Sequence, residues 1–395
     1  MDFRFGTEEE AFREEIRAFV RAELPAGWGA AAFNDREDTP ADLSPVSRAF
    51  QRKLADKGWL TLAWPKEYGG LGADPMQQLV YNEEMSALRA PAFPGIGVAM
   101  VGPTLMLHGT DEQRGRFLTS IARNEMSWCQ GFSEPGAGSD LASLQTRAVQ
   151  DGDDFIVNGQ KIWTSNAHRA DYCILLARTD PDAPKHRGIS YFLMDMKSPG
   201  ISIRPLTNML GSDHFNELFM DNVRIPRANL IGELNRGWYV ATTTLDFERS
   251  GIQRIVFAET LLHDLIAYAR ARSDGPRRLI DRPGVRNRLA DLQIEFNVGR
   301  LLSYRVAWMQ GQGQVPNSEA SIAKLYSTEL QLRFAVAAMN LLGVSGTLAR
   351  GSAHAVLGGR FESYYLAAFS YTIAAGTSEV QRNIIAQRGL GLPRD

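Results

Sequence analysis

The sequence predicts a mostly helical protein with a β domain in its middle, on three observations. In the first 123 residues or so, apolar side chains such as Phe12, Ile16 and Val20 recur at helical spacing. Between about residues 126 and 231, short apolar runs alternate with turn signals, as is typical of strands. Long helical patterns return from Gly237 onward. We therefore expect three domains, which span residues 1–125, 126–235 and 236–395.

The elements within these regions follow from local patterns. In the first region, Phe50 and Leu54 continue the helical spacing, WPKEYGGLGADP is a glycine-rich loop, and PAFPGIGVAMVGPTLMLHG begins a more buried helix. In the middle region, FIV and QKIW flank Asn158 and Gly159, which predicts a hairpin turn there. CILLA, ISYFLMDM and ELFMDNVRI predict further strands. Three long helical stretches follow, namely GWYVATTTLDFERSGIQRIVFAETLL, RNRLADLQIEFNVGRLLSYRVAWMQ and residues 320–342.

Composition narrows the possible functions of these 395 residues. The 43 basic and 45 acidic residues produce no large field, which argues against nucleic acid or an anionic membrane as partners. Cys129 and Cys173 are too few for a disulfide framework, so we expect a reducing, cytoplasmic compartment. The sequence shows neither a secretion signal nor an apolar stretch long enough to span a membrane. The six histidines form no metal-binding motif, and we expect no metal.

Two motifs have residues suited to a cofactor. In CQGFSEPGAGSD, glycines let backbone N–H groups turn toward a phosphate, and the hydroxyls of Ser133 and Ser139 can donate as well; a simple Gly-Ser turn is the alternative. In KIWTSNA, Trp163 offers a flat aromatic surface beside the hydroxyls of Thr164 and Ser165, which suits a flavin ring. An ordinary core tryptophan is the alternative for that motif.

Taken together with three other segments, these motifs resemble the signatures of the acyl-CoA dehydrogenase flavoprotein family. The five segments, in chain order, are GWLTLAWPKEYGGLG, GFSEPGAGSD, VNGQKIWTSNA, FMDNVRIPRANLIGELNRGW and AAGTSEVQRNIIAQRGLGLPR. The resemblance implies the acyl-CoA dehydrogenase fold: an N-terminal helical domain, a middle β-barrel or sandwich, and a C-terminal four-helix bundle, with FAD between the last two. It also implies conversion of an acyl-CoA thioester to a trans-2-enoyl-CoA.

The resemblance assigns roles to individual residues. It places Phe132 and Ser133 at the flavin's pyrimidine side, and Trp163 with Ser165 at its reactive middle. The expected cofactor contacts are Gln130, Phe132, Ser133, Gly138, Ser139, Trp163, Thr164, Ser165, Arg272, Thr377, Glu379 and Gln381. The expected substrate contacts are Ser139, Asp246, Arg249 and Gly376.

The catalytic base is not where many family members carry it, because Ala375 occupies that position. A second group, which includes isovaleryl-CoA dehydrogenase, carries the glutamate on a bundle helix, and LDFER resembles that motif with Glu248 as the base. On a continuous helix Glu248 would share an apolar face with Ile252 and Ile255, and desolvation there would raise its pKa toward neutrality. Periodicity alone leaves open a half-buried glutamate paired with a neighbouring arginine.

A further departure from the family suggests a partner. The family's R-x-T-F-G motif, which reaches the FAD of a neighbouring subunit, keeps only Arg272 here, and Asn340 stands where a glutamine is expected. We therefore expect either a heterotetramer with a related subunit, as in bacterial members that act on sterol-derived acyl-CoA, or a homotetramer that binds FAD somewhat differently. The resemblance implies an electron-transferring flavoprotein as acceptor.

Two other functions remain open. A non-catalytic scaffold subunit is favoured by Ala375 and opposed by the flavin motifs, and a flavin monooxygenase of the same fold is opposed by Glu248. The small side chains of Ala374 and Ala375 leave room for a branched or bulky acyl group, although the sequence does not define its length, branching or ring content.

Overall fold

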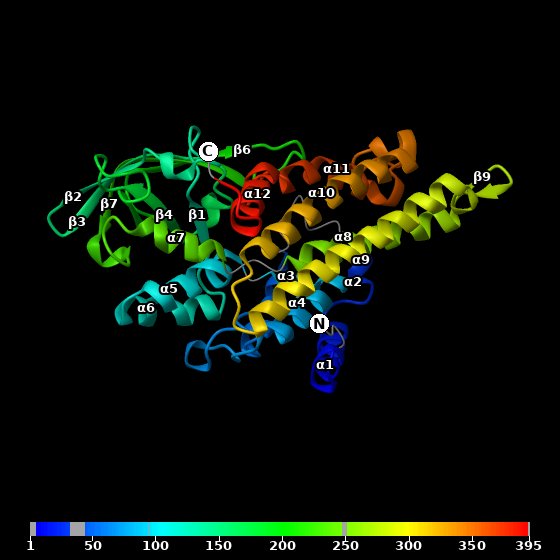
Figure 1. The fold of residues 1–395 in the computed structure, drawn as a ribbon, viewed down its shortest axis with the longest axis horizontal. Coiled ribbons are helices and arrows are strands. Elements are labelled where there is room, and N and C mark those ends of the chain that lie inside the picture. The colour runs from blue at the N-terminus through cyan, green and yellow to red at the C-terminus, as the bar shows by residue number, and fades with distance from the viewer. Residues whose placement is uncertain (1–4, 32–43, 94, 247–250, 394–395) are drawn as a thin grey trace. The chain divides into compact units, whose positions relative to one another are not determined.

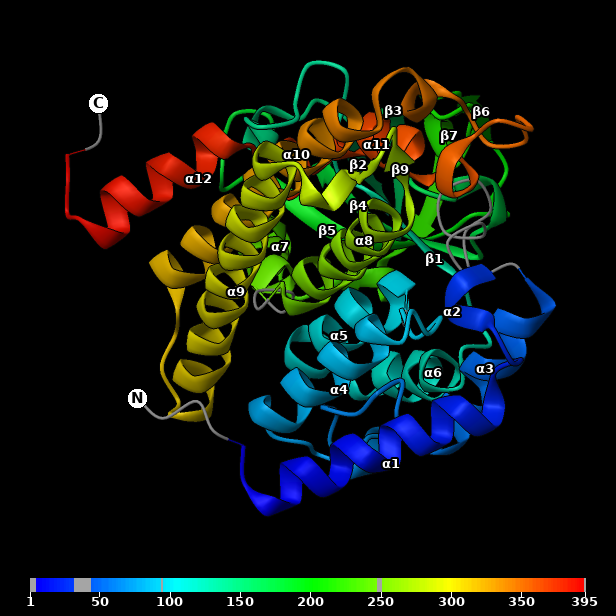
Figure 2. The same ribbon diagram turned by 90° about the vertical axis from the view of Figure 1, so that its right-hand side faces the viewer.

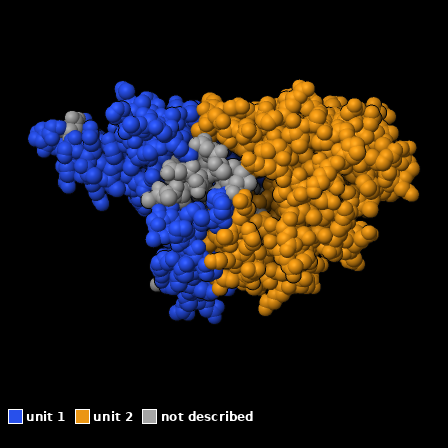
Figure 3. All heavy atoms as spheres, turned by 180° about the vertical axis from the view of Figure 1, so that it is seen from behind, with its two compact units in different colours: residues 1–46, 74–91, 249–395 blue, residues 47–73, 92–248 orange. Residues whose placement is uncertain are grey.

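The computed structural model describes residues 5–31, 44–93, 95–246 and 251–393, and it confirms a mostly helical protein with a central sheet (Figures 1 and 2). The chain packs as two compact units, which Figure 3 colours separately. The first unit comprises residues 1–46, 74–91 and 249–395, and the second comprises residues 47–73 and 92–248. This division follows packing, so the boundaries predicted at residues 125 and 235 stay predictions.

The second unit is built around an eight-stranded sheet. Its strands are β1 (Trp128–Gly131), β2 (Arg147–Asp151), β3 (Asp154–Lys161), β4 (Tyr172–Arg178), β5 (Ile189–Asp195), β6 (Ile201–Leu206), β7 (Phe215–Pro226) and β8 (Leu230–Ile231). The strand order is β6-β7-β3-β2-β4-β5-β8, and β1 pairs with β4 in parallel. Its helices are most of α3 (Pro45–Asp56), α5 (Gly102–His108), α6 (Asp111–Ala122) and α7 (Gly237–Asp246).

Strand β4 lies in the middle of this unit and is buried on both faces. Cys173 and Leu175 contribute to the hydrophobic cluster on one face, which also contains Phe155 and residues of β7. Ile174 and Leu176 alternate to the other face and pack in the cluster that α5 and α6 supply. Double-sided burial explains why CILLA reads as a continuous apolar run rather than an alternating one.

The predicted hairpin turn at Asn158–Gly159 is wrong. Both residues lie inside β3, which pairs with β7 on either side of a register shift between Val157 and Gly159. The chain instead reverses between β2 and β3 at Gly152, whose φ of 62° suits a tight turn. Gly159 is required by close approach, since a Cβ there would lie 2.5 Å from Thr146 Oγ1.

The first unit is helical apart from one two-stranded ribbon. Its helices are α1 (Thr7–Glu23), α2 (Trp28–Ala31), α4 (Pro75–Ala87), α8 (Ile252–Ala271), α9 (Pro283–Gly311), α10 (Asn317–Leu342), α11 (Arg360–Tyr371) and α12 (Ser378–Ile384). The ribbon pairs β9 (Ser273–Asp274) with β10 (Arg277–Arg278). Helices α8 to α11 share one core, which includes Leu262, Phe296, Phe334 and Tyr364. None of the described helices is both long and apolar enough to cross a membrane.

The helical stretch predicted from Gly237 through residue 262 is two helices rather than one. Helix α7 ends at Asp246, and α8 begins at Ile252 after Gly251, which has a left-handed φ of 65°. A right-handed helix cannot continue through that conformation. The continuous helix expected to carry Glu248 and Ile252 is therefore interrupted at Gly251, and Glu248 itself lies outside the described residues.

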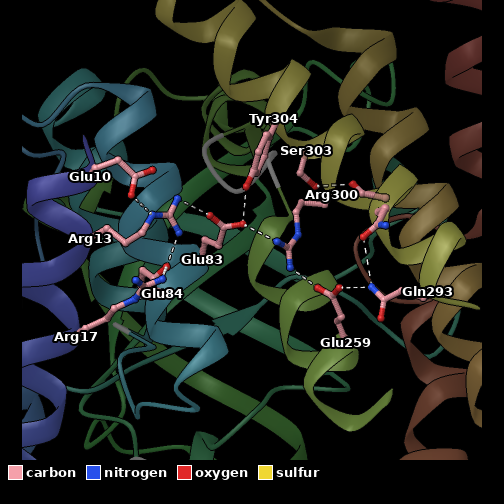
Figure 4. Close-up of polar contacts among 12 residues, drawn as sticks. Glu10, Arg13, Arg17, Glu83, Glu84, Glu259, Gln293, Arg300, Ser303 and Tyr304 are labelled. Carbon is pink, nitrogen blue, oxygen red and sulfur yellow. Dashed lines mark hydrogen bonds and ion pairs between the residues drawn. The ribbon is translucent and has the colours of Figure 1, made fainter. Parts of the chain in front are cut away.

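A network of ion pairs with buried carboxylates joins α1, α4, α8 and α9 within the first unit (Figure 4). Its carboxylates are Glu83, Glu84 and Glu259, and its guanidinium groups are Arg13, Arg17 and Arg300. Glu83 accepts hydrogen bonds from Tyr304 OH at 2.5 Å and from Arg13 Nη2 at 3.0 Å. Each acid lies beside a base, so the charges can stay buried at moderate energetic cost.

Substituting Gly159 with alanine tests the close approach of β3 to Thr146. We expect Gly159→Ala to lower the free energy of unfolding by about 1–3 kcal/mol, because the new methyl group overlaps Thr146. Chemical denaturation monitored by circular dichroism measures the change. Gly115→Ala in α6 is the control, since its Cβ meets nothing within 4 Å and should stabilise the helix by up to about 1 kcal/mol. Equal stabilities for the two variants would contradict the packing described here.

Candidate active site

The first cofactor motif lies where β1 leaves the sheet. Phe132 is buried, with its ring edge-on to Tyr191 at a centroid distance of 5.9 Å. The chain then turns tightly, because the backbone N–H groups of Glu134 and Ala137 each donate to the other residue's carbonyl. Gly138, which follows this turn, is exposed, and a Cβ there would meet nothing within 4 Å. The loop surface therefore has free space beside the residues expected to contact phosphate.

An ion pair that the sequence analysis missed holds this loop from behind. Lys161, the last residue of β3, is fully buried, and its Nζ lies 2.8 Å from Glu134 Oε1. The Glu134 carboxylate also accepts hydrogen bonds from the backbone N–H groups of Gln145 at 2.6 Å and Thr146 at 2.8 Å. The alternation of the strand could have predicted that Lys161 is buried, because Lys161 follows Phe155 and Val157 at the inward-facing positions of β3.

The pair alters the titration of both groups. Burial lowers the pKa of Lys161 to about 8, although attraction to Glu134 opposes the shift. Burial by itself would raise the pKa of Glu134, but attraction to Lys161 and the hydrogen bonds to its carboxylate outweigh it and hold that pKa below its usual value. Near neutral pH, both groups are therefore charged inside the second unit.

The second cofactor motif directly follows Lys161. Trp163 has a left-handed φ of 60° and is 59% exposed, so the alternative of an ordinary core tryptophan is excluded. Thr164 is fully buried, and its Oγ1 has no hydrogen-bond partner among the described residues. Its backbone is held firmly, because Thr164 and Asn216 exchange N–H···O bonds of 3.0 and 3.1 Å.

These two features fit a flavin. A left-handed conformation of a bulky residue costs on the order of 1–3 kcal/mol and is found mostly at functional sites. A buried hydroxyl without a partner is likewise unfavourable unless a bound group supplies one. An exposed aromatic ring beside such a hydroxyl can stack on a flat heterocycle and hydrogen-bond its edge.

The structure brings the two motifs of the second unit together. The backbone N–H of Ile162 donates to the carbonyl of Ser133 at 2.9 Å, one residue beyond the contact of Lys161 with the same loop. Of the other predicted residues, Gln130 is half-buried on β1, Ser139 is exposed, and Ser165 is half-buried. All the predicted cofactor residues of this unit thus belong to one continuous region around β1 and the end of β3.

In the first unit, the predicted cofactor residues other than Arg272 lie around the start of α12. Thr377 caps this helix by accepting a hydrogen bond from the Val380 N–H, and Gln381 is buried, with its Nε2 3.0 Å from the carbonyl of Ala375. Ala375 and Gly376 both have left-handed φ values, of 54° and 85°. A side chain at Gly376 would be strained by this φ, and its Cβ would displace the Gln381 amide, whose Nε2 would lie 2.7 Å away.

A second lysine missed by sequence analysis holds this turn. Lys324 on α10 donates to the carbonyl of Gly376 at 2.7 Å and to that of Tyr371 at 3.3 Å. Burial lowers the pKa of Lys324 to about 8, and repulsion from Arg254 adds to the shift. A lysine within an apolar helical pattern is usually solvated, so no local sequence signal marked it.

The remaining predicted residues are placed as follows. Glu379 is exposed, and its pKa is lowered, chiefly because its carboxylate accepts a hydrogen bond from its own backbone N–H. Arg272 is exposed at the C-terminus of α8, immediately before the β9–β10 ribbon. Asp246 is the last residue of α7. Arg249, like Glu248, lies outside the described residues.

Three family models match successive parts of the chain. They describe the acyl-CoA dehydrogenase N-terminal domain at residues 6–125, the middle domain at residues 129–223 and the C-terminal domain at residues 235–390. Acyl-CoA dehydrogenase FadE26 of Mycobacterium tuberculosis is 38% identical over 402 residues, which cover 100% of this chain and 99% of that protein.

Solved structures agree. The Tcur3481-Tcur3483 steroid ACAD matches with a TM-score of 0.89 at 35% identity, and the ChsE4-ChsE5 complex from Mycobacterium tuberculosis with a TM-score of 0.88 at 38% identity. Both matches cover 100% of this chain and 100% of the matched chain. The chain therefore belongs to the acyl-CoA dehydrogenase family, and it is an oxidoreductase that acts on acyl-CoA.

Proposed function

We propose that this acyl-CoA dehydrogenase oxidises a CoA thioester with a bulky, steroid-derived acyl group to its trans-2-enoyl-CoA. The proposal is carried by the full-length match to a structure described as a steroid acyl-CoA dehydrogenase. The small and exposed side chains of Ala374 and Ala375, beside the turn expected to contact substrate, are compatible with a large acyl group.

FAD is the proposed cofactor, because the family is flavin-dependent and the second unit offers a matching set of groups. Trp163 would stack against the flavin ring, and Thr164 Oγ1 would gain the partner that it lacks among the described residues. The exposed Gly138–Ser139 segment would bind phosphate, and Thr377 and Gln381 would add contacts from α12. Bound FAD supplies the acceptor for the β hydrogen, which leaves the substrate as hydride.

Glu248 is the proposed base. Its carboxylate would take the α proton, a step that Ala375 cannot perform because its side chain is a methyl group. The assignment rests on the LDFER motif, since Glu248 lies outside the described residues. Asp246, Arg249 and Gly376 are proposed to contact the thioester.

A related second subunit is the proposed partner. Arg272 is the only residue of the R-x-T-F-G motif, which reaches the FAD of a neighbouring subunit, that this chain keeps. The residues after it form the short β9–β10 ribbon. The names of two similar solved structures, Tcur3481-Tcur3483 and ChsE4-ChsE5, each join two different proteins. A homotetramer remains the competing arrangement. In either assembly, an electron-transferring flavoprotein in the cytoplasm is the proposed electron acceptor.

Anaerobic bleaching of the flavin tests the reaction and its base. We expect steroid-side-chain CoA thioesters to bleach the FAD-loaded protein with formation of enoyl-CoA, and Glu248→Gln to slow bleaching by about 10²–10⁴-fold while retaining FAD, because the α proton then has no acceptor. Glu329→Gln, which removes an acid paired with Arg382, is the control and should bleach at the wild-type rate. An unchanged rate in Glu248→Gln would remove the base assignment. Absence of bleaching with steroid, straight-chain and branched thioesters would favour the scaffold function.

Thr164→Val tests the cofactor contact. We expect the variant to bind FAD about 3–10-fold more weakly, because the cofactor loses a hydrogen bond in a buried site. The flavin-free protein should be no less stable than wild type, since the hydroxyl that is removed has no partner. Fluorescence titration and thermal melting measure the two quantities. Thr104→Val is the matched control, because Thr104 Oγ1 donates to the Met100 carbonyl at 2.8 Å, so this change should cost stability and leave FAD affinity unaltered.

Purification of the chain alone tests the need for a partner. We expect substoichiometric FAD in the isolated protein and one FAD per complete site after addition of the related subunit, because the motif around Arg272 is incomplete. Absorbance at the flavin band, together with light scattering, measures cofactor content and mass. A stable homotetramer with full FAD content would contradict the two-subunit arrangement.

A further inference from the structure

Lys161 has a second contact that the ion pair with Glu134 does not explain. Its Nζ also donates to the backbone carbonyl of Phe132 at 3.1 Å. Gly131 packs tightly on β4, since a Cβ at that residue would lie 3.0 Å from Cys173 Sγ and 3.2 Å from Leu175 Cδ1. The buried ammonium of Lys161 therefore bridges the Glu134 carboxylate and the Phe132 carbonyl.

Stability alone is a poor reason to keep such a lysine. Bringing two charges into a protein interior costs several kcal/mol per ion, and the attraction between them often only offsets that cost. Hydrophobic residues of similar size frequently replace buried pairs without loss of stability. We therefore looked for a functional role of Lys161 in the loop that follows β1.

The carbonyl that Lys161 contacts belongs to the same peptide unit as the Ser133 N–H. A hydrogen bond to the oxygen of an amide polarises the whole planar unit and makes its N–H a stronger donor. No described residue accepts a hydrogen bond from the Ser133 N–H, whereas the Ser133 carbonyl is used by Ile162. The strengthened donor is therefore available to a ligand on the outer side of the loop.

We infer that Lys161 is a positioning residue for the flavin, which holds the Phe132–Ser133 peptide in place and strengthens the Ser133 N–H as a donor to the pyrimidine edge of the ring. The inference rests on the proposed function, in which this loop contacts FAD. Negative charge develops at the pyrimidine edge when flavin is reduced, so a stronger donor favours the reduced cofactor. Lys161 thereby raises the reduction potential of the bound flavin.

The ionisation of Lys161 connects this effect to pH. The titratable groups that face its Nζ are Glu134 on the loop and Cys173 on β4. Because burial lowers the pKa of Lys161 to about 8, the ammonium loses its proton as pH rises through that value, and its polarising effect weakens. Removing the Glu134 charge would remove the attraction that sustains the ammonium, so Lys161 would then lose its proton at a lower pH.

Reduction potentials of the FAD-loaded protein test the inference, with the full-length chain assembled as required for full FAD content. We expect Lys161→Met to lower the two-electron potential by about 30 mV at pH 7, which corresponds to a roughly tenfold loss of preference for reduced flavin. Glu134→Gln should also lower the potential, and by more as pH rises, because its Lys161 loses the proton at a lower pH than in the wild type. Lys185→Met is the matched control, because Lys185 pairs with Asp140 on the exposed side of the same loop, at 2.6 Å, and should leave the potential unchanged.

The outcomes are distinguishable. If Lys161→Met does not fold, the double variant Glu134→Gln/Lys161→Met removes both charges and should show the same lowered potential without the pH dependence. The inference would be overturned if the FAD-loaded single and double variants kept the wild-type potential and its pH dependence. If these variants are still bleached normally by substrate, the proposed function stays intact. A wild-type protein that binds no FAD even with its partner subunit would overturn the proposed function and this inference together.

Discussion

The contact between Lys161 and Glu134 is the interaction on which the second unit's site depends. Neither charge can be removed alone without leaving the other buried and unpaired, which typically costs 3–5 kcal/mol. The pair fixes the loop after β1 against the end of β3, and through Ile162 the same region fixes the segment that contains Trp163. Two motifs that are separate in sequence are thus joined by the buried Lys161–Glu134 pair and by the backbone hydrogen bond between Ile162 and Ser133.

Both units use the same device at their predicted ligand contacts. In each, a buried or half-buried lysine donates to backbone carbonyls of a turn, Lys161 to Phe132 and Lys324 to Gly376. In each, a residue other than glycine adopts a left-handed conformation next to the motif, namely Trp163 and Ala375. Local strain of this kind persists only where surrounding contacts over-determine the backbone, and the lysines provide such contacts.

This chain departs from the usual family sequence at the catalytic base and at the motif that contains Arg272. Ala375 leaves no proton acceptor at the turn before α12, while the LDFER motif contains Glu248 earlier in the chain. Small side chains at the turn are compatible with a bulky acyl group. Of the R-x-T-F-G motif this chain keeps only Arg272, and the residues that follow it form the β9–β10 ribbon.

Sequence patterns were enough to predict the fold class, the family, most strands of the sheet and the regions that are helical, because periodicity and the five long motifs are local signals. Features that depend on contacts between residues far apart in the sequence could be seen only in the folded structure. The turn predicted at Asn158–Gly159 lies instead at Gly152, because β3 continues through Asn158 and Gly159 and pairs with β7 on both sides of the register shift there. Lys161 found its acid 27 residues away, and such pairings are set by how strands meet in space, which no local pattern records.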